Sequence, residues 1–358
     1  MTKKINKIAF WPQKNDYNEF ININVNIVKK FCNELVDIED NMKNMLDADL
    51  VFFSWFEGIF GKNIEEIEKY YLSKTQLIKL LKERNIKIVT FFHNKVPHDL
   101  PKLNLEYSIK FAKYLYDFSD KLIVLNNASK KYLSDYLPQE TVENKSMLIN
   151  HPNYINVYDG WRIKAPQTNR NDFRVLFLGM IRPYKNIELI FKLANEFNNS
   201  GIKFIVAGYP LDFEYVIKLN DQSKNLRNLK FIPQAILGEN LSNLVSECDA
   251  FALPYNTDSA INSGPFFLAA SYGKTSIMPN TPAVDEYSNS LVYKYEYMSH
   301  EDHFDKLFEA TKQAYDDWKN DKVSFYDKGS QLFEKVKTEN SIKVLTSQYN
   351  SLFETLGY

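Results

Sequence analysis

Short apolar runs alternate with longer helical patterns along most of this chain, and this alternation restricts the fold more than any other feature. The runs that are typical of buried strands cover residues 5–11, 48–56, 87–94, 121–126, 145–151, 174–179, 203–208, 229–233, 249–255 and 274–279. Strands that alternate with helices form parallel sheets with right-handed crossovers. The sequence therefore predicts an α/β protein with two Rossmann-like, doubly wound domains.

The boundary between the two predicted domains lies where the periodicity is lost. Residues 157–173 are rich in polar residues and contain a proline, which is typical of a linker. We therefore expect an N-terminal domain over 1–156 and a second domain over 174–325. The tail 326–358 has a helical pattern, and we expect it to brace the first domain. A length of 358 residues fits two domains of ordinary size.

Composition excludes several classes of protein. Lys and Arg number 44 against 45 Asp and Glu, so no overall field attracts nucleic acid, and we expect no nucleic-acid partner. Cys32 and Cys248 lie far apart without metal-ligand spacing, which indicates a reducing compartment without disulfides. The first apolar run is too short for a signal peptide, and no later segment approaches a membrane span. We therefore expect a cytoplasmic protein.

The candidate site residues lie in the loops that follow the predicted strands. Ligands of open α/β sheets bind beyond the carboxyl ends of the strands. The loops in question cover residues 11–18, 55–58, 93–99, 182–185, 208–209 and 254–264. We expect the two domains to face each other and to enclose a cleft that these loops line.

One of these loops has the character of an anion-binding site. Gly179 permits a sharp exit from a buried strand, and Arg182 and Lys185 follow just before an apolar-periodic helix. The positive end of a helix favours a phosphate, and two cations add charge-assisted hydrogen bonds. The alternative is that Arg182 and Lys185 are ordinary solvated loop charges.

Taken in order, the motifs resemble those of the GT-B glycosyltransferases, in particular the family-4-like enzymes that build bacterial surface polysaccharides. The matching segments are SWFE, FFHNKVPHD, MLINHPNY, GMIRPYKN, DAFALPYN and NSGPFFLAASYGKTSI, and together they extend over nearly the whole chain. No G-x-G-x-x-G fingerprint occurs, which argues against a dinucleotide cofactor. The resemblance implies that the second domain binds a nucleotide-sugar donor.

The resemblance also implies which residues hold the donor. Arg182 and Lys185 match the Arg and Lys that neutralise the leaving diphosphate in the family, a task that cations and helix ends perform without a metal. Asn262, Ser263 and Gly264 precede an apolar helix and are expected at the same phosphates. Gly208 and Tyr209 complete the expected donor contacts. We expect a UDP- or GDP-hexose donor and no metal requirement, because the two cations and the helix ends already offset the charge of the diphosphate.

The chain departs from the family at two positions. Many retaining members carry a pair of glutamates around the helix after residue 263, and the aligned positions here hold Ala260 and Leu268. The roles of those glutamates are therefore not carried over. Asp258 lies near enough in the sequence to take part of that function, although an exposed loop aspartate is the commoner explanation.

The expected catalytic residues lie in the first domain. His93 ends a strand in the segment where the family places groups near the transferred sugar and the acceptor. An inverting mechanism needs a base for the acceptor hydroxyl, and Glu57, His98 and Asp99 are the alternatives. A metal site of His93, His98 and Asp99 lacks further ligands and is not expected. We expect a structural role for His151 and solvated side chains for His300 and His303.

These features predict a hexosyltransferase that acts on a glycan or a lipid-linked acceptor. The alternatives are a nucleotide-sugar epimerase, which needs no acceptor, and a sugar-binding protein without catalysis. Basic and aromatic residues in KKINKIAFW and in 102–118 suit the inner face of the cytoplasmic membrane, so a peripheral position there is a further expectation. The alternative is that these aromatic rings form the inner sides of ordinary helices.

Overall fold

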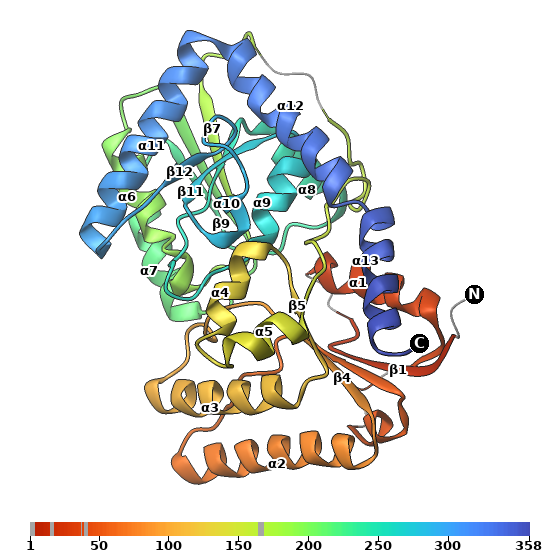
Figure 1. Ribbon diagram of the computed structural model, residues 1–358. Coiled ribbons are helices and arrows are strands. Elements are labelled where there is room, and N and C mark those ends of the chain that lie inside the picture. The colour runs from red at the N-terminus through yellow and green to blue at the C-terminus, as the bar shows by residue number, and fades with distance from the viewer. Residues whose placement is uncertain (1–3, 15–17, 37, 39–41, 164–167) are drawn as a thin grey trace. The chain divides into compact units, whose positions relative to one another are not determined.

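The chain divides into two compact units. The computed structural model describes residues 4–14, 18–36, 38, 42–163 and 168–358 (Figure 1). Unit 1 comprises Met1–Pro152 and Asn340–Tyr358, and unit 2 comprises Asn153–Glu339. Within the described residues, each unit contains one sheet of six strands that pair in parallel, as the alternation of strands and helices predicts.

The sheet of unit 1 has the strand order β2-β1-β3-β4-β5-β6. Its strands are β1 (Ile5–Trp11), β2 (Cys32–Val36), β3 (Leu50–Phe53), β4 (Lys87–Phe92), β5 (Lys121–Val124) and β6 (Ser146–Leu148). Its helices are α1 (Glu19–Val28), η1 (Lys29–Phe31), η2 (Met42–Asp47), α2 (Ile64–Glu83), α3 (Lys102–Phe118), η3 (Asn127–Ser129), α4 (Lys130–Leu133), α5 (Gln139–Lys145) and α13 (Ile342–Thr355). Helices α2 and α3 pack side by side (Figure 1).

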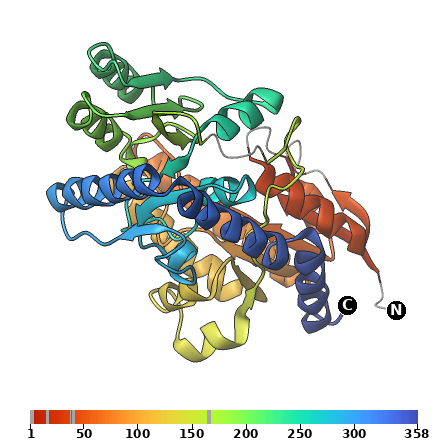
Figure 2. The ribbon, with the colours of Figure 1, turned by 90° about the horizontal axis from the view of Figure 1, so that it is seen from above.

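Aromatic side chains fill much of the core of unit 1. All four residues of β3 are buried, which explains why this strand is a continuous apolar run rather than an alternating one. The rings of Phe10 and Phe52 stack with their centroids 5.3 Å apart. Tyr349 on α13 lies 6.1 Å from Phe52, and its hydroxyl donates to Asn24 Oδ1 at 2.7 Å. Helix α13 therefore braces unit 1 beside α1, as expected for the end of the tail (Figure 1 and Figure 2).

The sheet of unit 2 has the strand order β12-β11-β10-β7-β8-β9. Its strands are β7 (Phe173–Leu178), β8 (Ile202–Ala207), β9 (Leu229–Ile232), β10 (Ala250–Ala252), β11 (Thr275–Pro279) and β12 (Tyr293–Tyr295). Its helices are η4 (Pro183–Lys185), α6 (Glu188–Glu196), α7 (Phe213–Ser223), α8 (Gly238–Glu247), α9 (Gly264–Ser271), α10 (Pro282–Asp285), α11 (His300–Asn320) and α12 (Lys322–Glu339).

Numbered along unit 2 alone, these strands have the Rossmann order 3-2-1-4-5-6. The order reverses between β7 and β10, and a crevice for ligands opens at such a point beyond the carboxyl ends of the strands. In unit 1 the corresponding reversal lies between β1 and β3. The fold therefore makes the loops after β7 and β10 the first place to search for a ligand site in unit 2.

The predicted linker differs from the observed boundary. The chain passes between units at Pro152/Asn153, so the described parts of 157–173 belong to unit 2, while residues 164–167 lie outside the described residues. Trp161 Nε1 donates to Ser271 O at 3.1 Å, and Tyr154 N donates to Ser271 Oγ at 2.8 Å. This segment lacks the periodicity of a helix or strand, but hydrogen bonds from its side chains and backbone still attach it to unit 2.

The tail is also divided differently from the prediction for 326–358. Helix α12 belongs to unit 2, and only residues from Asn340 onward belong to unit 1. A Cβ built on Gly329 of α12 would lie 2.0 Å from Gly273 O, so these two backbones touch. Glycine permits such close backbone contact. This contact attaches α12 to the end of α9 in unit 2.

Two strands were not predicted, namely β2 and β12. Strand β2 lies at the edge of its sheet and has an exposed Asn33 and Glu34, and β12 has three residues at the edge of the other sheet. Short edge strands carry a weak hydrophobic signal. Several predicted strands are shorter in the structure, because apolar residues such as Phe56 and Ile149 are buried in loops.

Candidate functional site

Two glycines allow the loops after β7 and β8 to touch. A Cβ built on Gly208 would lie 1.7 Å from Gly179 O, and both glycines have a φ of +153°. A Cβ on Gly179 would lie 2.9 Å from Lys185 Nζ and 3.6 Å from Pro265 Cγ. The structure therefore gives Gly208 a backbone-packing role, and Gly179 leaves space for the ammonium group of Lys185 beside the start of α9.

Lys185 is buried at the strand reversal of unit 2. Lys185 is 5% exposed. Its Nζ lies 5.7 Å from the ring centroid of Phe177, 5.8 Å from that of Tyr184 and 5.9 Å from that of Tyr255. Ring faces attract an ammonium group. Most lysines avoid burial unless a partner compensates for the charge, so this position differs from that of a solvated loop lysine.

Hydrogen bonds tie the Lys185 loop to the loop after β10. Asn186, in the left-handed conformation, donates from Nδ2 to Pro254 O at 3.0 Å. Asn256 N donates to Tyr184 O at 3.0 Å. Because β7 and β10 flank the reversal of strand order, these bonds hold the two loops of the crevice together.

Arg182 precedes Lys185 in the same loop. Its guanidinium carbon lies 5.4 Å from the centroid of the Tyr184 ring, and the residue is half-buried. The Tyr184 ring therefore lies beside the cationic groups of both residues. A rigid loop that carries two positive charges suits a ligand with two adjacent negative groups.

The start of α9 offers less to a phosphate than its sequence suggests. Ser263 is 3% exposed, and its Oγ accepts from Phe266 N at 3.2 Å as an N-cap and donates to Tyr255 OH at 3.4 Å. Pro265 has no N–H group, and Phe267 N donates to Ser263 O at 3.4 Å. In the first turn, the N–H of Gly264 is therefore the group most suited to a ligand.

The remaining predicted donor residues surround this crevice less closely. Tyr209 is 37% exposed at the end of β8, where its carbonyl accepts from Ile181 N at 2.8 Å. Asn262 is half-buried before Ser263. Ala260 and Leu268, at the positions of the family's glutamates, are 3% and 6% exposed, so they pack as apolar side chains. Asp258 is exposed, and its N–H donates to Asn256 Oδ1 at 2.8 Å.

In unit 1, His93 lies in a stack of aromatic rings. Its ring centroid is 4.1 Å from that of Trp55 and 5.5 Å from that of Phe91, and its Nε2 lies 2.6 Å from Ser54 Oγ. Burial and, to a smaller extent, the nearby His151 lower the pKa of His93 to about 3. His93 is therefore a neutral imidazole that exchanges a hydrogen bond with Ser54.

Glu57 occupies the interior of unit 1 rather than its surface. It is 8% exposed, and its Oε1 accepts from Tyr116 OH at 2.9 Å. Burial raises the pKa of Glu57, against the lowering effects of its own N–H, of Tyr116 and of Lys74. The carboxylate is thus engaged with Tyr116 inside the unit, and the role of Glu57 as the base stays a prediction.

Lys74 of α2 is the residue that sequence reasoning missed. It is 5% exposed, and its Nζ donates to Phe56 O at 2.7 Å and to Gly58 O at 2.8 Å. Burial lowers the pKa of Lys74 to about 8, although Glu57 raises it. A signal was present, because Lys74 lies on the same helix face as the buried Ile67 and Ile78. A charge on an apolar helix face indicates a buried, partnered side chain.

His98 and Asp99 lie in the loop after β4, close to His93 in the sequence. His98 is half-buried, whereas Asp99 is exposed and has a φ of +53°. Over the part of the chain that the structure describes, no group of three or more His, Cys, Asp and Glu side chains is arranged to hold a metal ion. The same part contains no helix with the length and apolar character needed to cross a bilayer.

Two other histidines have structural contacts. His151 is buried, its Nδ1 lies 2.8 Å from Pro152 O, and its carbonyl accepts from Asn340 Nδ2 at 2.8 Å. The expectation that His303 is solvated is wrong. His303 is 1% exposed, and its ring stacks on Tyr297 with centroids 3.8 Å apart. His303 lies on the buried face of α11.

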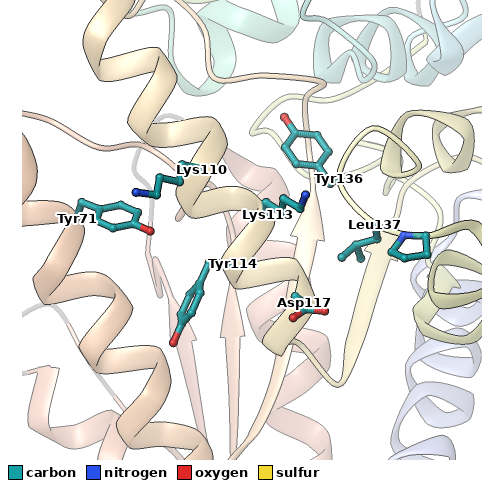
Figure 3. A pocket seen from close by; sticks show the side chains of 8 residues that line it. Tyr71, Lys110, Lys113, Tyr114, Asp117, Tyr136 and Leu137 are labelled. Carbon is teal, nitrogen blue, oxygen red and sulfur yellow. The ribbon is translucent and has the colours of Figure 1, made fainter.

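An open cavity of about 370 Å³ lies elsewhere on unit 1 (Figure 3). Its lining comes from α2, α3 and the segment between α4 and α5, and consists of Tyr71, Lys110, Lys113, Tyr114, Asp117, Tyr136, Leu137 and Pro138. None of the predicted site residues lines it. The cavity therefore lies outside the strand-end loops. The candidate site is identified by the placement of its side chains and not by this cavity.

Comparison with known proteins agrees with this geometry. Residues 161–265 match the sequence profile of the family described as Glycosyl transferases group 1. This segment includes Arg182, Lys185 and the start of α9. No protein of curated function matches the chain in sequence.

Solved structures resemble the chain over nearly its whole length. HepE of Anabaena, in complex with UDP-glucose, is 12% identical with a TM-score of 0.70, and the match covers 98% of this chain and 100% of HepE. Sucrose-phosphate synthase of Thermosynechococcus elongatus is 12% identical with a TM-score of 0.71, and the match covers 98% and 99% of the two chains. A mutant of TarM from S. aureus, in complex with fondaparinux, α-GlcNAc-glycerol and UDP, is 15% identical with a TM-score of 0.57, and the match covers 78% of this chain and 54% of TarM.

At these identities the likeness establishes the fold. The predicted fold class is confirmed, since two six-stranded parallel sheets with packed helices match glycosyltransferases of this type. The protein therefore has the GT-B fold, and residues 161–265 of its second unit carry the sequence pattern of the group 1 glycosyl transferases.

Proposed function

We propose that the protein is a glycosyltransferase that moves a hexose from a nucleotide-diphosphate sugar to a glycan or a lipid-linked acceptor in surface polysaccharide biosynthesis. One observation carries the proposal. At the strand reversal of unit 2, the buried Lys185 lies beside Gly179 and the start of α9, with Arg182 in the same loop. This arrangement supports an anion site, because Rossmann-like sheets bind nucleotides at this position.

The proposed donor is a UDP- or GDP-hexose. HepE, which shares the fold, binds UDP-glucose, and the group 1 match covers the whole anion site. In the proposed complex, Lys185 and Arg182 contact the diphosphate, and the N–H of Gly264 donates to one of its oxygens. Asn262 and Ser263 before α9, and Gly208 and Tyr209 after β8, are proposed as further donor contacts. Ser263 also caps α9, and Gly208 also packs against Gly179.

The proposed chemistry is charge neutralisation of the leaving group. Cleavage of the bond between the sugar and the diphosphate leaves negative charge on the nucleoside diphosphate, and fixed cations stabilise that charge in the transition state. Two cations and a helix N-terminus perform this role without a metal, so we expect turnover to continue in EDTA. Loss of turnover in EDTA with recovery in magnesium or manganese would contradict the metal-independent mechanism.

For an inverting reaction, we propose Glu57, His98 or Asp99 as the base that takes the proton of the acceptor hydroxyl. His98 and Asp99 lie after β4 and are at least partly accessible, and Glu57 follows β3. His93 is proposed to contact the sugar rather than to accept the proton. Loss of the base should reduce turnover and preserve binding of UDP. Near-normal turnover of Glu57→Gln, His98→Ala and Asp99→Asn alike would direct the search to Asp258 or to a retaining mechanism.

A position on the inner face of the cytoplasmic membrane is a further part of the proposal. Leu103 and Ile109 of α3 are each 38% exposed, and Lys102, Lys110 and Lys113 are exposed on the same helix. Exposed apolar side chains among lysines suit an anionic lipid surface. Sedimentation with vesicles that contain phosphatidylserine should exceed sedimentation with neutral vesicles, and equal sedimentation would contradict it.

A panel of nucleotide sugars tests the main proposal. Release of nucleoside diphosphate should depend on a glycan or lipid-linked acceptor and should yield an extended acceptor by mass spectrometry. Conversion of the donor sugar without an acceptor would identify an epimerase. Donor binding without any conversion would identify a binding protein.

A further inference from the structure

Trp55 is a large aromatic side chain that the fold holds at the surface of unit 1. It follows β3 after Ser54, and it is 39% exposed. It is the most exposed of the four tryptophans, since Trp11 and Trp161 are half-buried and Trp318 is 2% exposed. Its backbone has a φ of +53°, a conformation that bulky side chains rarely adopt.

The contacts of the indole leave one side of it available. The ring of His93 covers one face at a centroid distance of 4.1 Å and an interplanar angle of 20°, and Phe91 continues the stack behind His93 at 5.5 Å and 14°. Phe20 lies 5.8 Å away at a tilt of 59°. Because these rings support one face and one side, the exposed surface of Trp55 includes the opposite face of the indole.

The chain on both sides of Trp55 is fixed by hydrogen bonds to other elements. Ser54 N donates to Trp11 O at 2.8 Å, and Ser54 Oγ bonds to His93. On the other side, Lys74 holds the carbonyls of Phe56 and Gly58, and Tyr116 holds Glu57. A strained backbone persists only where its surroundings determine it, and such positions concentrate at functional sites.

The chemistry of this surface is apolar and uncharged. The supporting imidazole of His93 is neutral above acidic pH because burial lowers its pKa to about 3. A flat aromatic face with negative π-density attracts the polarised C–H groups on one side of a pyranose ring. An anion would gain little there, in contrast to the Lys185 site.

We propose that the outer face of Trp55 is a binding subsite for a neutral pyranose ring of the acceptor glycan. The assignment rests on the proposed glycosyltransferase function, and it names the acceptor because the residues proposed for the donor phosphates all belong to unit 2. The rings of His93 and Phe91 keep the indole in place, while Lys74 and Glu57 hold the loop that carries it. Trp55 acts as a positioning residue and takes no part in proton transfer.

Sugar binding and transfer are measured on the full chain and on four variants. The probes are the methyl α- and β-glycosides of glucose, galactose and N-acetylglucosamine, followed by saturation-transfer NMR, and UDP binding is measured by calorimetry. Trp55→Ala removes the platform and Trp55→Phe retains a smaller ring. Trp55→Gly removes the ring but relieves the positive φ, so it separates binding from folding. Phe60→Ala is the matched control, since Phe60 is 58% exposed in the same loop.

We expect at least one methyl glycoside to bind the native protein. Trp55→Ala and Trp55→Gly should each lose tenfold or more in glycoside affinity and in acceptor kcat/KM, Trp55→Phe should lose about threefold, and Phe60→Ala should be unchanged. The affinity for UDP should be unchanged in all four variants. Trp55→Gly should melt at a higher temperature than Trp55→Ala, because glycine adopts a positive φ without strain.

Four results would overturn the subsite. The first three are the absence of glycoside binding to the native protein, native affinity in Trp55→Gly, and a loss in Phe60→Ala as large as that in Trp55→Ala. A loss confined to the KM of the donor would also overturn it, because it would assign Trp55 to the donor sugar. If glycosides bind through Trp55 but no donor is consumed, the subsite stands and the transferase function fails.

Discussion

The two sheets of this protein end in loops of opposite chemistry. In unit 2 the strand reversal between β7 and β10 carries the buried cation Lys185, with Arg182 beside it. In unit 1 the strand ends carry His93 and His151, whose pKa values are lowered to about 3 and about 4, together with the exposed ring of Trp55. The same architecture therefore presents charge in one unit and neutral rings in the other, which divides the expected ligands into phosphates and sugars.

Two buried lysines make this comparison sharper. Lys74 and Lys185 are each 5% exposed. Lys74 donates to two backbone carbonyls of its own unit, and it lies near Glu57. Lys185 lies among three aromatic rings at the strand reversal of unit 2. We infer that Lys74 stabilises its loop and that Lys185 binds ligand, so their replacement should affect different measurements.

The largest expected effect is on the stability of unit 1 in Lys74→Met. The change leaves the carbonyls of Phe56 and Gly58 without their donor and Glu57 without a nearby positive charge, so the free energy of unfolding should fall by about 3 kcal/mol. Urea unfolding measures it. Lys79→Met is the matched control, because Lys79 on the same helix is exposed and forms only a surface ion pair with Glu83. Equal stability of the two variants would contradict a structural role for Lys74.

Lys185→Met should instead weaken binding of UDP by roughly 1.5 to 3 kcal/mol, the scale of a hydrogen bond to a charged group. Arg182→Ala should have an effect in the same range. Calorimetry with UDP measures both, and unfolding should change little. Lys192→Met is a matched control. Lys192 is exposed to solvent, and it lies within α6, outside the loops after β7 and β10. Native UDP affinity in both Lys185→Met and Arg182→Ala would remove the basis of the proposed donor site.

The neutral histidines of unit 1 predict a loss of stability in acid. The unfolded chain protonates His93 below pH 6.5, whereas the folded chain resists protonation down to about pH 3, so the free energy of unfolding falls as the pH decreases through this range. At pH 5 the contribution of His93 is roughly 2 kcal/mol less than at pH 8. His93→Gln removes this term, and its amide can still bond to Ser54.

The difference in stability between the native protein and His93→Gln should therefore become smaller between pH 8 and pH 5. His151 changes stability in the same direction, but it is present in both proteins and cancels in the difference if its pKa stays the same. A difference that is independent of pH would show that His93 titrates normally. The same lowering of the two pKa values keeps the imidazole rings of His93 and His151 uncharged near neutral pH.

Most of the fold was predictable because the interior strands are buried on both faces. Strands such as β3, with four buried residues, appear in the sequence as continuous apolar runs. The edge strands β2 and β12 lack that signal. The boundary between units was placed too late, because Trp161 and Tyr154 pack on α9 through contacts that have no periodicity. Local patterns report regular elements but not such tertiary contacts.

The candidate site was predictable to a different degree in the two units. In unit 2 a strand, a cationic turn and a helix follow one another within a short segment, so local sequence brings Lys185 and Arg182 to the crevice. In unit 1 the surroundings of Glu57 include Lys74 and Tyr116, which are distant in sequence. The sequence placed Glu57 among the catalytic residues only because it follows a strand. Its interactions with Lys74 of α2 and Tyr116 of α3 become visible only in the packed structure.

The smallest expected effect concerns Ser263, which the sequence assigns to the donor and the structure uses as a helix cap. Its Oγ accepts from Phe266 N, so Ser263→Ala should lower the free energy of unfolding by about 1 kcal/mol, and Ser263→Gly should lower it by only a few tenths. Thermal unfolding measures the relative stability of the native protein, Ser263→Gly and Ser263→Ala. UDP affinity should change less than in Lys185→Met, because Ser263 Oγ is engaged with Phe266 and Tyr255. If Ser263→Ala instead keeps its stability and loses as much UDP affinity as Lys185→Met, the hydroxyl contacts the phosphate directly, and the start of α9 contributes more to the anion site than the N–H of Gly264.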